Sequence, residues 1–213
     1  MARIVTALTP QQKNKERVNL YLDGKFVCGL ASLVAARLKL GQSLNDEELA
    51  TLQALDEIEE THNKTLHYLS FRPRSRGEIM RYLKEKQTPD EVSAQILERL
   101  ERVGLVNDES FAQYWVENRE QFAPRSKRAL QQELRQKGLS AEETQAALND
   151  VDEEHSAYEA ARKRAARMQA LDHETFQRRL SGFLQRRGFG YAVTKTVVAR
   201  LWQERGGTVN SEQ

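Results

Sequence analysis

The feature that most constrains this chain of 213 residues is an internal repeat with a period of about fifty residues. When Leu83, Leu134 and Leu184 are aligned, three further apolar positions match in all three copies without a gap. These columns are Ile79, Leu130 and Leu180 four positions earlier, Leu97, Leu148 and Val198 fourteen positions later, and Leu100, Val151 and Leu201 seventeen positions later. Offsets of three and four residues are typical of one helix face. Each copy is therefore predicted to be helical.

The residues that end the aligned helices repeat as well. Gly138 and Gly188 each follow the aligned leucine by four residues, and each is followed by an apolar residue. This pattern predicts a Schellman motif, in which the helix ends at a residue with left-handed backbone conformation. The first copy departs, because Gln87 stands where glycine would fit, and the form of its turn stays open; Thr88, Pro89 and Glu91 still supply a cap, an N1 proline and a capping-box acid for the next helix.

One more helical stretch precedes each aligned helix, at residues 66–69, 111–116 and 157–168. The sequence therefore predicts a mainly α fold of three tandem three-helix repeats after an N-terminal extension. The expected parts are an extension at 1–62 and repeats at 63–106, 107–151 and 152–213, the last with the C-terminal tail. Because so small a unit buries little surface alone, the repeats are expected to pack end to end in an elongated, curved array.

The N-terminal extension has a different pattern. The segments at 3–8, 17–22 and 25–30 are rich in β-branched and apolar residues, and Asp23-Gly24 separates the last two, which predicts a β-hairpin within two or three antiparallel strands. Residues 33–40 suit a short helix. Ser43 or Asn45 can then cap a longer helix that carries an apolar stripe of Leu49, Leu52, Leu55 and Ile58.

Charge is segregated, although the net charge is only +2. Residues 46–60 contain seven acids and no Lys or Arg, whereas 72–86 contain six basic residues and two acids. Basic residues recur on the second helix of each repeat, with Arg162, Lys163, Arg164 and Arg167 near the third. Ordinary solvated helix faces explain each charge singly. Together they predict a basic track that meets nucleic acid or an acidic protein surface. The predicted contact residues are Arg72, Arg74, Arg76, Arg81, Lys84, Arg125, Lys127, Arg128, Arg135, Lys137, Arg178, Arg179, Arg186 and Arg187.

The sequence offers no catalytic, metal or cofactor site. Cys28 has no second thiol with which to form a disulfide, and His62, His67, His155 and His173 are scattered, so each histidine is expected to be exposed or half-buried. No phosphate-binding GxxxxGK[ST], GxGxxG or GxSxG pattern occurs. The aromatic residues, Trp115 and Trp202 included, mostly have helical core spacing. These observations argue against an enzyme.

No signal-peptide pattern and no apolar run of membrane-spanning length is found. The chain is accordingly expected to be cytoplasmic, away from membranes, and monomeric.

With these motifs laid out, the chain resembles the RecX family of regulatory proteins, bacterial modulators of the RecA recombinase. The resemblance covers about residues 60 to 205. It is carried by RPRSRGEIMRYL from Arg72, GLVNDESFAQYW from Gly104, QELRQKGLS from Gln132 and FLQRRGFGY from Phe183. The N-terminal stretch ALTPQQKNKERVNLYLDGKF is similar to an extension that some members carry.

The resemblance implies three tandem three-helix repeats and no catalytic centre. It also implies binding along the helical groove of a RecA filament on single-stranded DNA, usually with inhibition of ATP hydrolysis and strand exchange, in DNA recombination and repair. Non-specific contact with duplex DNA is compatible with the same basic track.

Two other functions stay open. Three-helix units resemble helix-turn-helix modules, so the chain could read a specific duplex sequence. Alternatively, the acidic helix within residues 1–60 could bind another protein, which would make the chain an adaptor.

Overall fold

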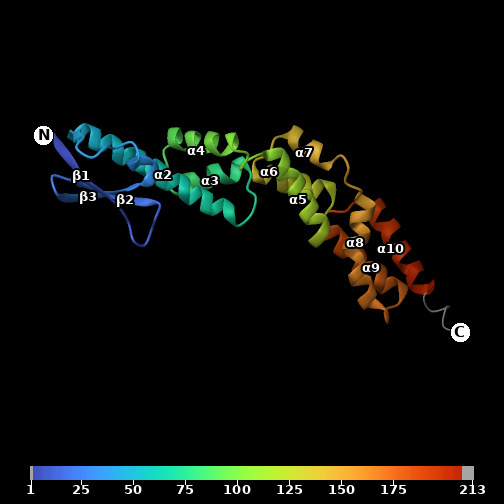
Figure 1. The fold of residues 1–213 in the computed structure, drawn as a ribbon. Helices are drawn as coiled ribbons and strands as arrows, with labels where there is room; N and C mark the ends of the chain where they lie inside the picture. The colour runs from blue at the N-terminus through green and yellow to red at the C-terminus, as the bar shows by residue number, and fades with distance from the viewer. Residues whose placement is uncertain (1, 208–213) are drawn as a thin grey trace. The chain divides into compact units, whose positions relative to one another are not determined.

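The computed structural model describes residues 2–207, which are mostly helical and begin with a small β-sheet (Figure 1). The strands are β1 (Arg3–Pro10), β2 (Arg17–Leu22), β3 (Lys25–Ala31) and β4 (Ser43–Leu44). The helices are α1 (Ser32–Ala35), α2 (Asp46–Ser70), α3 (Arg76–Glu85), α4 (Asp90–Arg102), α5 (Asp108–Phe122), α6 (Lys127–Lys137), α7 (Ala141–Leu148), α8 (Glu153–Ala165), the 3₁₀ turn η1 (Ala166–Met168), α9 (His173–Arg186) and α10 (Tyr191–Gly207).

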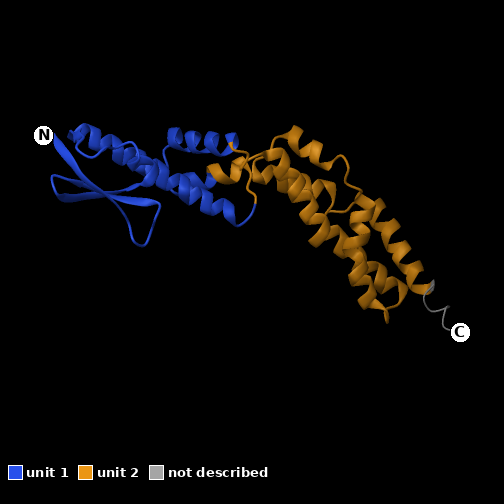
Figure 2. Cartoon of the chain, viewed as in Figure 1, with its two compact units in different colours: residues 1–72, 81–102 blue, residues 73–80, 103–213 orange. Residues whose placement is uncertain are grey.

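The chain divides into two compact units (Figure 2). Unit 1 holds the residues up to 72 together with 81–102, and unit 2 holds 73–80 and the residues from 103 onward. Helix α3 crosses the division after Met80, so its first turns belong to unit 2 and its end to unit 1. Each unit is described by itself below.

The sheet of unit 1 is antiparallel with the strand order β3-β2-β1-β4. The predicted hairpin is confirmed, because Asp23 and Gly24 have positive φ angles of 48° and 78°, as a tight two-residue connection requires. Leu20 and Leu30 of the sheet are fully buried in one cluster with Leu49 and Leu52 of α2. The two-residue strand β4 was not predicted, since a strand so short carries no periodic signal.

Two predictions in this region were wrong. The short helix expected at 33–40 is only the single turn α1, and Leu33 and Leu40 are exposed. The acidic helix and the stretch at 66–69 were expected as separate elements but form one 25-residue helix, α2. Of the two candidate caps, Asn45 begins it, through a capping box with Glu48.

Unit 2 contains two three-helix bundles. Helices α5, α6 and α7 pack around a core that includes Phe111, Leu130 and Leu134. Helices α8, α9 and α10 pack around a second core that includes Phe176 and Leu184. The aligned columns are buried in all three copies, with side chains at most 7% exposed, which confirms the predicted repeat and its core residues.

The three second helices end in the same turn. The amide of Leu139 donates to the carbonyl of Leu134 at 3.2 Å, and the amide of Phe189 donates to the carbonyl of Leu184 at the same distance. Gly138 and Gly188 have φ angles of 96° and 91°, as the Schellman prediction requires. Gln87 adopts the same left-handed conformation, with φ of 58°, and the amide that follows it donates to the carbonyl of Leu83 at 3.1 Å. The turn therefore survives the absence of glycine in the first copy.

Within unit 2, the first residues of the second helix of one repeat contact the last residues of the second helix of the following repeat. The Ser75 hydroxyl, just before α3, donates to the Lys137 carbonyl at the end of α6 (2.6 Å). At the corresponding place before α6 the donor is a backbone amide: the amide of Ser126 donates to the Arg187 carbonyl at the end of α9 (3.2 Å). These joints bring the positive end of one helix dipole to the negative end of another. They are end-to-end contacts of the expected kind, whereas the curvature of the array stays a prediction.

Candidate functional site

The structure divides the fourteen predicted contact residues into two groups. Eight are exposed, namely Arg76, Arg81, Lys84, Arg128, Arg135, Arg178, Arg179 and Arg186. Six are partly buried, namely Arg72, Arg74, Arg125, Lys127, Lys137 and Arg187. A majority of the predicted contact residues is therefore exposed, whereas the other six lie partly inside the fold.

Two of the partly buried residues hold the repeats together. The Lys137 ammonium pairs with the Glu78 carboxylate at 2.5 Å and lies 4.6 Å from the centre of the Trp115 ring. The Arg187 guanidinium donates to the Pro124 carbonyl at 2.9 Å and lies over the Phe183 ring. Lys86 is the equivalent residue of the first copy, and it lies over Tyr82. Lys137 and Arg187 are therefore used within the fold, whereas Lys86 is exposed; each of the three lies over an aromatic ring.

Arg125 also has a partner inside the repeat. The Glu133 carboxylate accepts from Arg125 (3.0 Å), from Arg119 (2.8 Å) and from the Trp115 indole (2.9 Å). Lys127 donates at 3.4 Å to the carbonyl of Asn149. Reversal of these charges would disturb the second repeat itself. Arg125 and Lys127 are therefore poor candidates for a surface that binds a partner through unpaired charges.

The exposed group contains the better candidates. Among the described residues, Lys84, Arg128, Arg135, Arg179 and Arg186 form no ion pair, whereas Arg178 lies 3.8 Å from Glu174. Arg76 and Arg81, like the partly buried Arg72 and Arg74, also interact with other groups of the chain. Arg128 and Arg135 are seven residues apart on α6 and so lie on the same side of this helix. We call this pair the α6 stripe, and the pair Arg179 and Arg186 the α9 stripe.

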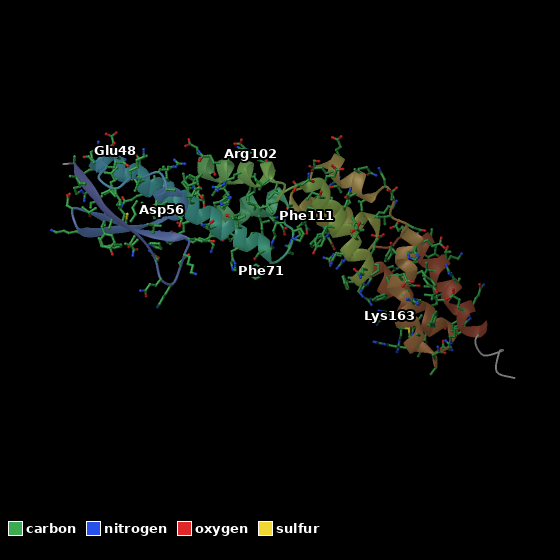
Figure 3. The ribbon with its side chains drawn as sticks, in the orientation of Figure 1. Glu48, Asp56, Phe71, Arg102, Phe111 and Lys163 are labelled. Carbon is green, nitrogen blue, oxygen red and sulfur yellow. The ribbon has the colours of Figure 1, made fainter. Side chains whose placement is uncertain are left out.

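The acidic block on α2 is largely used within unit 1. Asp56, labelled in Figure 3, is buried and accepts from Arg17 (2.8 Å) and from the Ala31 amide (2.5 Å). These bonds connect the sheet to the helix. Glu59 pairs with Arg99 at 2.7 Å, and Glu60 pairs with Lys64 at the same distance. These contacts favour an ordinary structural role for the block over an acidic docking surface.

Three aromatic side chains of the repeats contradict the core prediction, namely Tyr191, which is 75% exposed, and the pair Phe71 and Phe122. Phe71 is 70% exposed and Phe122 is 71% exposed, and each lies at the end of the first helix of its repeat. The sequence held a signal for them, because FRPRSR at Phe71 and FAPRSK at Phe122 are the same motif one repeat apart. Trp115 and Trp202 are partly buried against the two cores of unit 2, as predicted.

One histidine also departs from expectation. His62, expected to be exposed or half-buried, is only 7% exposed, and burial together with the charge of Arg99 lowers its pKa. Among the described residues no group of three or more His, Cys, Asp or Glu side chains could hold a metal ion. Within the same residues, no helix has the length and apolar character that crossing a bilayer demands.

The fold and its charges define a class of protein: a tandem array of three-helix repeats that presents free cations from the second helix of its repeats. Family models match four consecutive parts of the chain. The regulatory protein RecX N-terminal domain matches residues 3–45, and the first, second and third RecX three-helix domains match 62–100, 107–148 and 152–198.

Curated relatives agree with these models. A regulatory protein RecX of Bacillus subtilis (strain 168) is 30% identical over 205 residues, which cover 94% of this chain and 78% of the relative. One of Streptomyces coelicolor is 34% identical over 154 residues, or 71% of this chain and 82% of the relative. The chain therefore belongs to the RecX family of regulatory proteins.

Solved structures show the same architecture. A crystal structure of regulatory protein RecX superposes with a TM-score of 0.73 and 26% identity, and the match covers 92% of this chain and 98% of the other. RecX from Lactobacillus salivarius has a TM-score of 0.59 and 23% identity over 69% of this chain and 97% of the other, which supports the fold alone.

Proposed function

We propose that this chain binds RecA-type recombinase filaments on single-stranded DNA and lowers their ATP hydrolysis and strand exchange, without a catalytic step of its own. The observation that carries the proposal is the joint between second helices. At both joints a serine just before one second helix donates to the backbone carbonyl at the end of another, Ser75 through its hydroxyl to Lys137 and Ser126 through its amide to Arg187. A chain built in this way offers the same kind of surface at regular intervals, as a partner that is itself a polymer of identical subunits requires.

The α6 stripe is the proposed centre of contact. Arg128 and Arg135 are exposed and form no ion pair among the described residues, so their charges are available to acidic groups of a filament or to DNA phosphates. Several weak contacts of this kind, made by successive repeats, reinforce one another because the first raises the effective concentration of the rest.

Sequence-specific reading of duplex DNA is less well supported. In helix-turn-helix proteins a recognition helix enters the major groove and its first residues contact base edges. Here the third helices of the first two repeats begin with acids, Asp90 and Glu91 in α4 and Glu142 and Glu143 in α7. Carboxylates at these positions would repel DNA phosphates, whereas the free cations lie on the second helices.

The test is a titration of this protein into a RecA-type recombinase that hydrolyses ATP on single-stranded DNA. The wild-type protein should suppress hydrolysis at fewer than one molecule per recombinase subunit. The double variant Arg128→Glu/Arg135→Glu should need at least about tenfold more protein, since it reverses both charges of the stripe.

The matched control is Arg102→Glu/Lys195→Glu, which makes the same change of charge on exposed positions of third helices. It should suppress hydrolysis as the wild type does, and circular dichroism should show equal helicity for all three proteins. If the α6 variant suppressed hydrolysis like the wild type, the α6 stripe would be excluded. If the wild type had no effect on hydrolysis or strand exchange, the proposed function would fail.

A further inference from the structure

A cationic hollow lies in unit 2 where the end of α5 meets α8 and α9. It encloses about 330 Å³, and its cations are Lys163, Arg164, Arg167 and Arg187. Lys163 is labelled on α8 in Figure 3. Of these four residues only Arg187 was among the predicted contact residues.

The hollow carries more positive than negative charge, with four cations and two acids among its lining residues. Among the described residues, none of its four cations forms an ion pair, and the carbonyl of Pro124 that accepts from Arg187 is neutral. The two acids that line the hollow are Glu159, which pairs with Arg162, and Glu120. Burial lowers the pKa of Arg187, and the nearby charges of Arg125 and Arg164 lower it further. The guanidinium groups thus repel one another, and a bound anion would relieve that repulsion.

The guanidinium groups are held in place by an aromatic ring. Arg164 and Arg187 lie over Phe183, with their guanidinium carbons 4.9 Å and 4.8 Å from the ring centre. Such stacking restricts both side chains before any ligand arrives. A planar guanidinium fixed in this way suits the paired oxygen atoms of a phosphate.

An exposed aromatic side chain on the edge of the hollow indicates which anion binds. Phe122 lines the hollow and is 71% exposed, so its ring is available to a flat partner. Single-stranded nucleic acids supply such a partner beside a phosphate, and bases that stack on aromatic side chains next to a basic groove are their common mode of binding. The carboxylates of an acidic peptide would use the cations but not the ring.

We infer that this hollow and Phe122 form a binding site for single-stranded nucleic acid, in which a base stacks on Phe122 and an adjacent phosphate lies among Arg164, Arg167, Arg187 and Lys163. The inference rests on the proposed function only in one respect: the strand that binds here would be the single-stranded DNA of a recombinase filament. The binding itself needs no recombinase, so the two can be tested apart.

The first experiment uses the whole chain and a fluorescein-labelled strand of about 30 thymidines, with anisotropy measured between about 50 and 200 mM salt. Arg164→Ala/Arg167→Ala should bind at least about tenfold more weakly, with a salt dependence shallower by about 0.7 for each phosphate that the variant no longer neutralises. Phe122→Ala should bind about tenfold more weakly with an unchanged salt dependence. Tyr191→Ala is the matched control, since Tyr191 is 75% exposed but lies outside the hollow, and its binding should equal that of the wild type.

A second readout reports stacking directly. In Phe122→Trp the new indole should lose fluorescence when the thymidine strand is added, and a poly-glutamate chain of similar length should leave it unchanged. Thermal unfolding by circular dichroism checks that every variant is folded.

The inference is overturned if the wild type does not bind the thymidine strand, or if Phe122→Ala binds the strand as tightly as the wild type does. It is also overturned if the binding of poly-glutamate requires Arg164 and Arg167 while the binding of the strand does not. The same variants are assayed for suppression of filament ATP hydrolysis. Suppression by a wild-type protein that fails to bind the strand would overturn this site and leave the proposed function intact. Strand binding that depends on Phe122 without any suppression would support the site and count against the proposed function.

Discussion

The Ser75 hydroxyl lies 2.6 Å from the backbone carbonyl oxygen of Lys137, a residue 62 positions away in the chain. The same hydroxyl accepts from the Glu78 amide at 3.1 Å, so one side chain begins α3 and joins it to the end of α6. The Glu78 carboxylate in turn pairs with the Lys137 ammonium. This joint therefore combines a helix cap, a helix-end carbonyl and a partly buried ion pair.

The first prediction concerns Gly77, which lies in this joint. A Cβ atom there would stand 2.5 Å from the Lys137 carbonyl oxygen and 2.9 Å from the Cα of Gly138. Because both are backbone atoms, Gly77→Ala should lower the free energy of unfolding by about 1–3 kcal/mol, although alanine is ordinarily the better helix former. Urea unfolding followed by tryptophan fluorescence measures the change.

Gly182→Ala in α9 is the control for this variant. A Cβ atom there meets only the flexible end of Arg186 at 3.4 Å, so the substitution should raise the free energy of unfolding by up to about 1 kcal/mol. Equal effects at Gly77 and Gly182 would show that the joint tolerates a methyl group.

The second prediction concerns the left-handed turn of the first repeat. Gln87 has φ of 58°, a conformation that costs a residue with a Cβ atom about 1 kcal/mol and glycine almost nothing. Gln87→Gly should therefore stabilise the protein by about 1 kcal/mol in thermal and urea unfolding. Glu85→Gly, at the last residue of α3, should destabilise it by up to about 1 kcal/mol. Two changes of the same sign would refute this account of the turn.

The third prediction concerns the attachment of the sheet to α2. Asp56→Ala leaves the partly buried Arg17 and the Ala31 amide without their carboxylate, so the free energy of unfolding should fall by about 3 kcal/mol. Glu98→Ala removes an exposed pair with Arg102, in which both side chains are 71% exposed, and should cost less than about 1 kcal/mol. A destabilisation at Asp56 no larger than that at Glu98 would mean that the contact does not hold the sheet.

The fourth prediction is a pH dependence that arises from His62. Burial, aided by the positive charge of Arg99 and opposed by Glu59, lowers the pKa of His62 in the folded chain below its unfolded value of about 6.5. The unfolded chain then binds a proton more readily than the folded chain. The stabilisation from neutral His62 is therefore complete above pH 6.5 and is lost as the pH falls through the folded pKa.

His62→Gln should flatten this part of the stability profile between about pH 7 and 5. Proton NMR should also give His62 a titration midpoint below its ordinary value. A profile with the same slope in the variant would assign the pH dependence to other groups.

The repeat, its turns and its core were predictable because each leaves a local signal. The aligned columns had to be buried, and the left-handed residue had to follow the helix by a fixed number of positions. The continuity of α2 left no such signal, since nothing between Ile58 and Leu66 distinguishes one helix from two. Gln87 is the opposite case. A residue with a Cβ atom disfavours the left-handed backbone conformation, yet Gln87 adopts it because the surrounding repeat requires the turn.

The functional assignment of single cations was the part that the sequence could not settle. Lys137 and Arg128 are both basic residues of α6, yet Lys137 meets Glu78, which is 59 positions away in the chain, and Arg128 has no such partner among the described residues. Local pattern contains no information on a partner so distant. The exposed Phe122 was missed for a related reason, since the helical spacing of an aromatic residue does not reveal where its helix stops.

The joints between second helices have an evolutionary consequence. Ser126 reaches Arg187, and Ser75 reaches Lys137, by binding a carbonyl oxygen, an atom that every amino acid possesses. Substitutions of outward-facing side chains therefore leave the acceptor atoms of the joints unchanged. Natural selection can then change the binding surface of one repeat without changing the others. Such a chain can change what it recognises while the spacing of its modules is inherited intact.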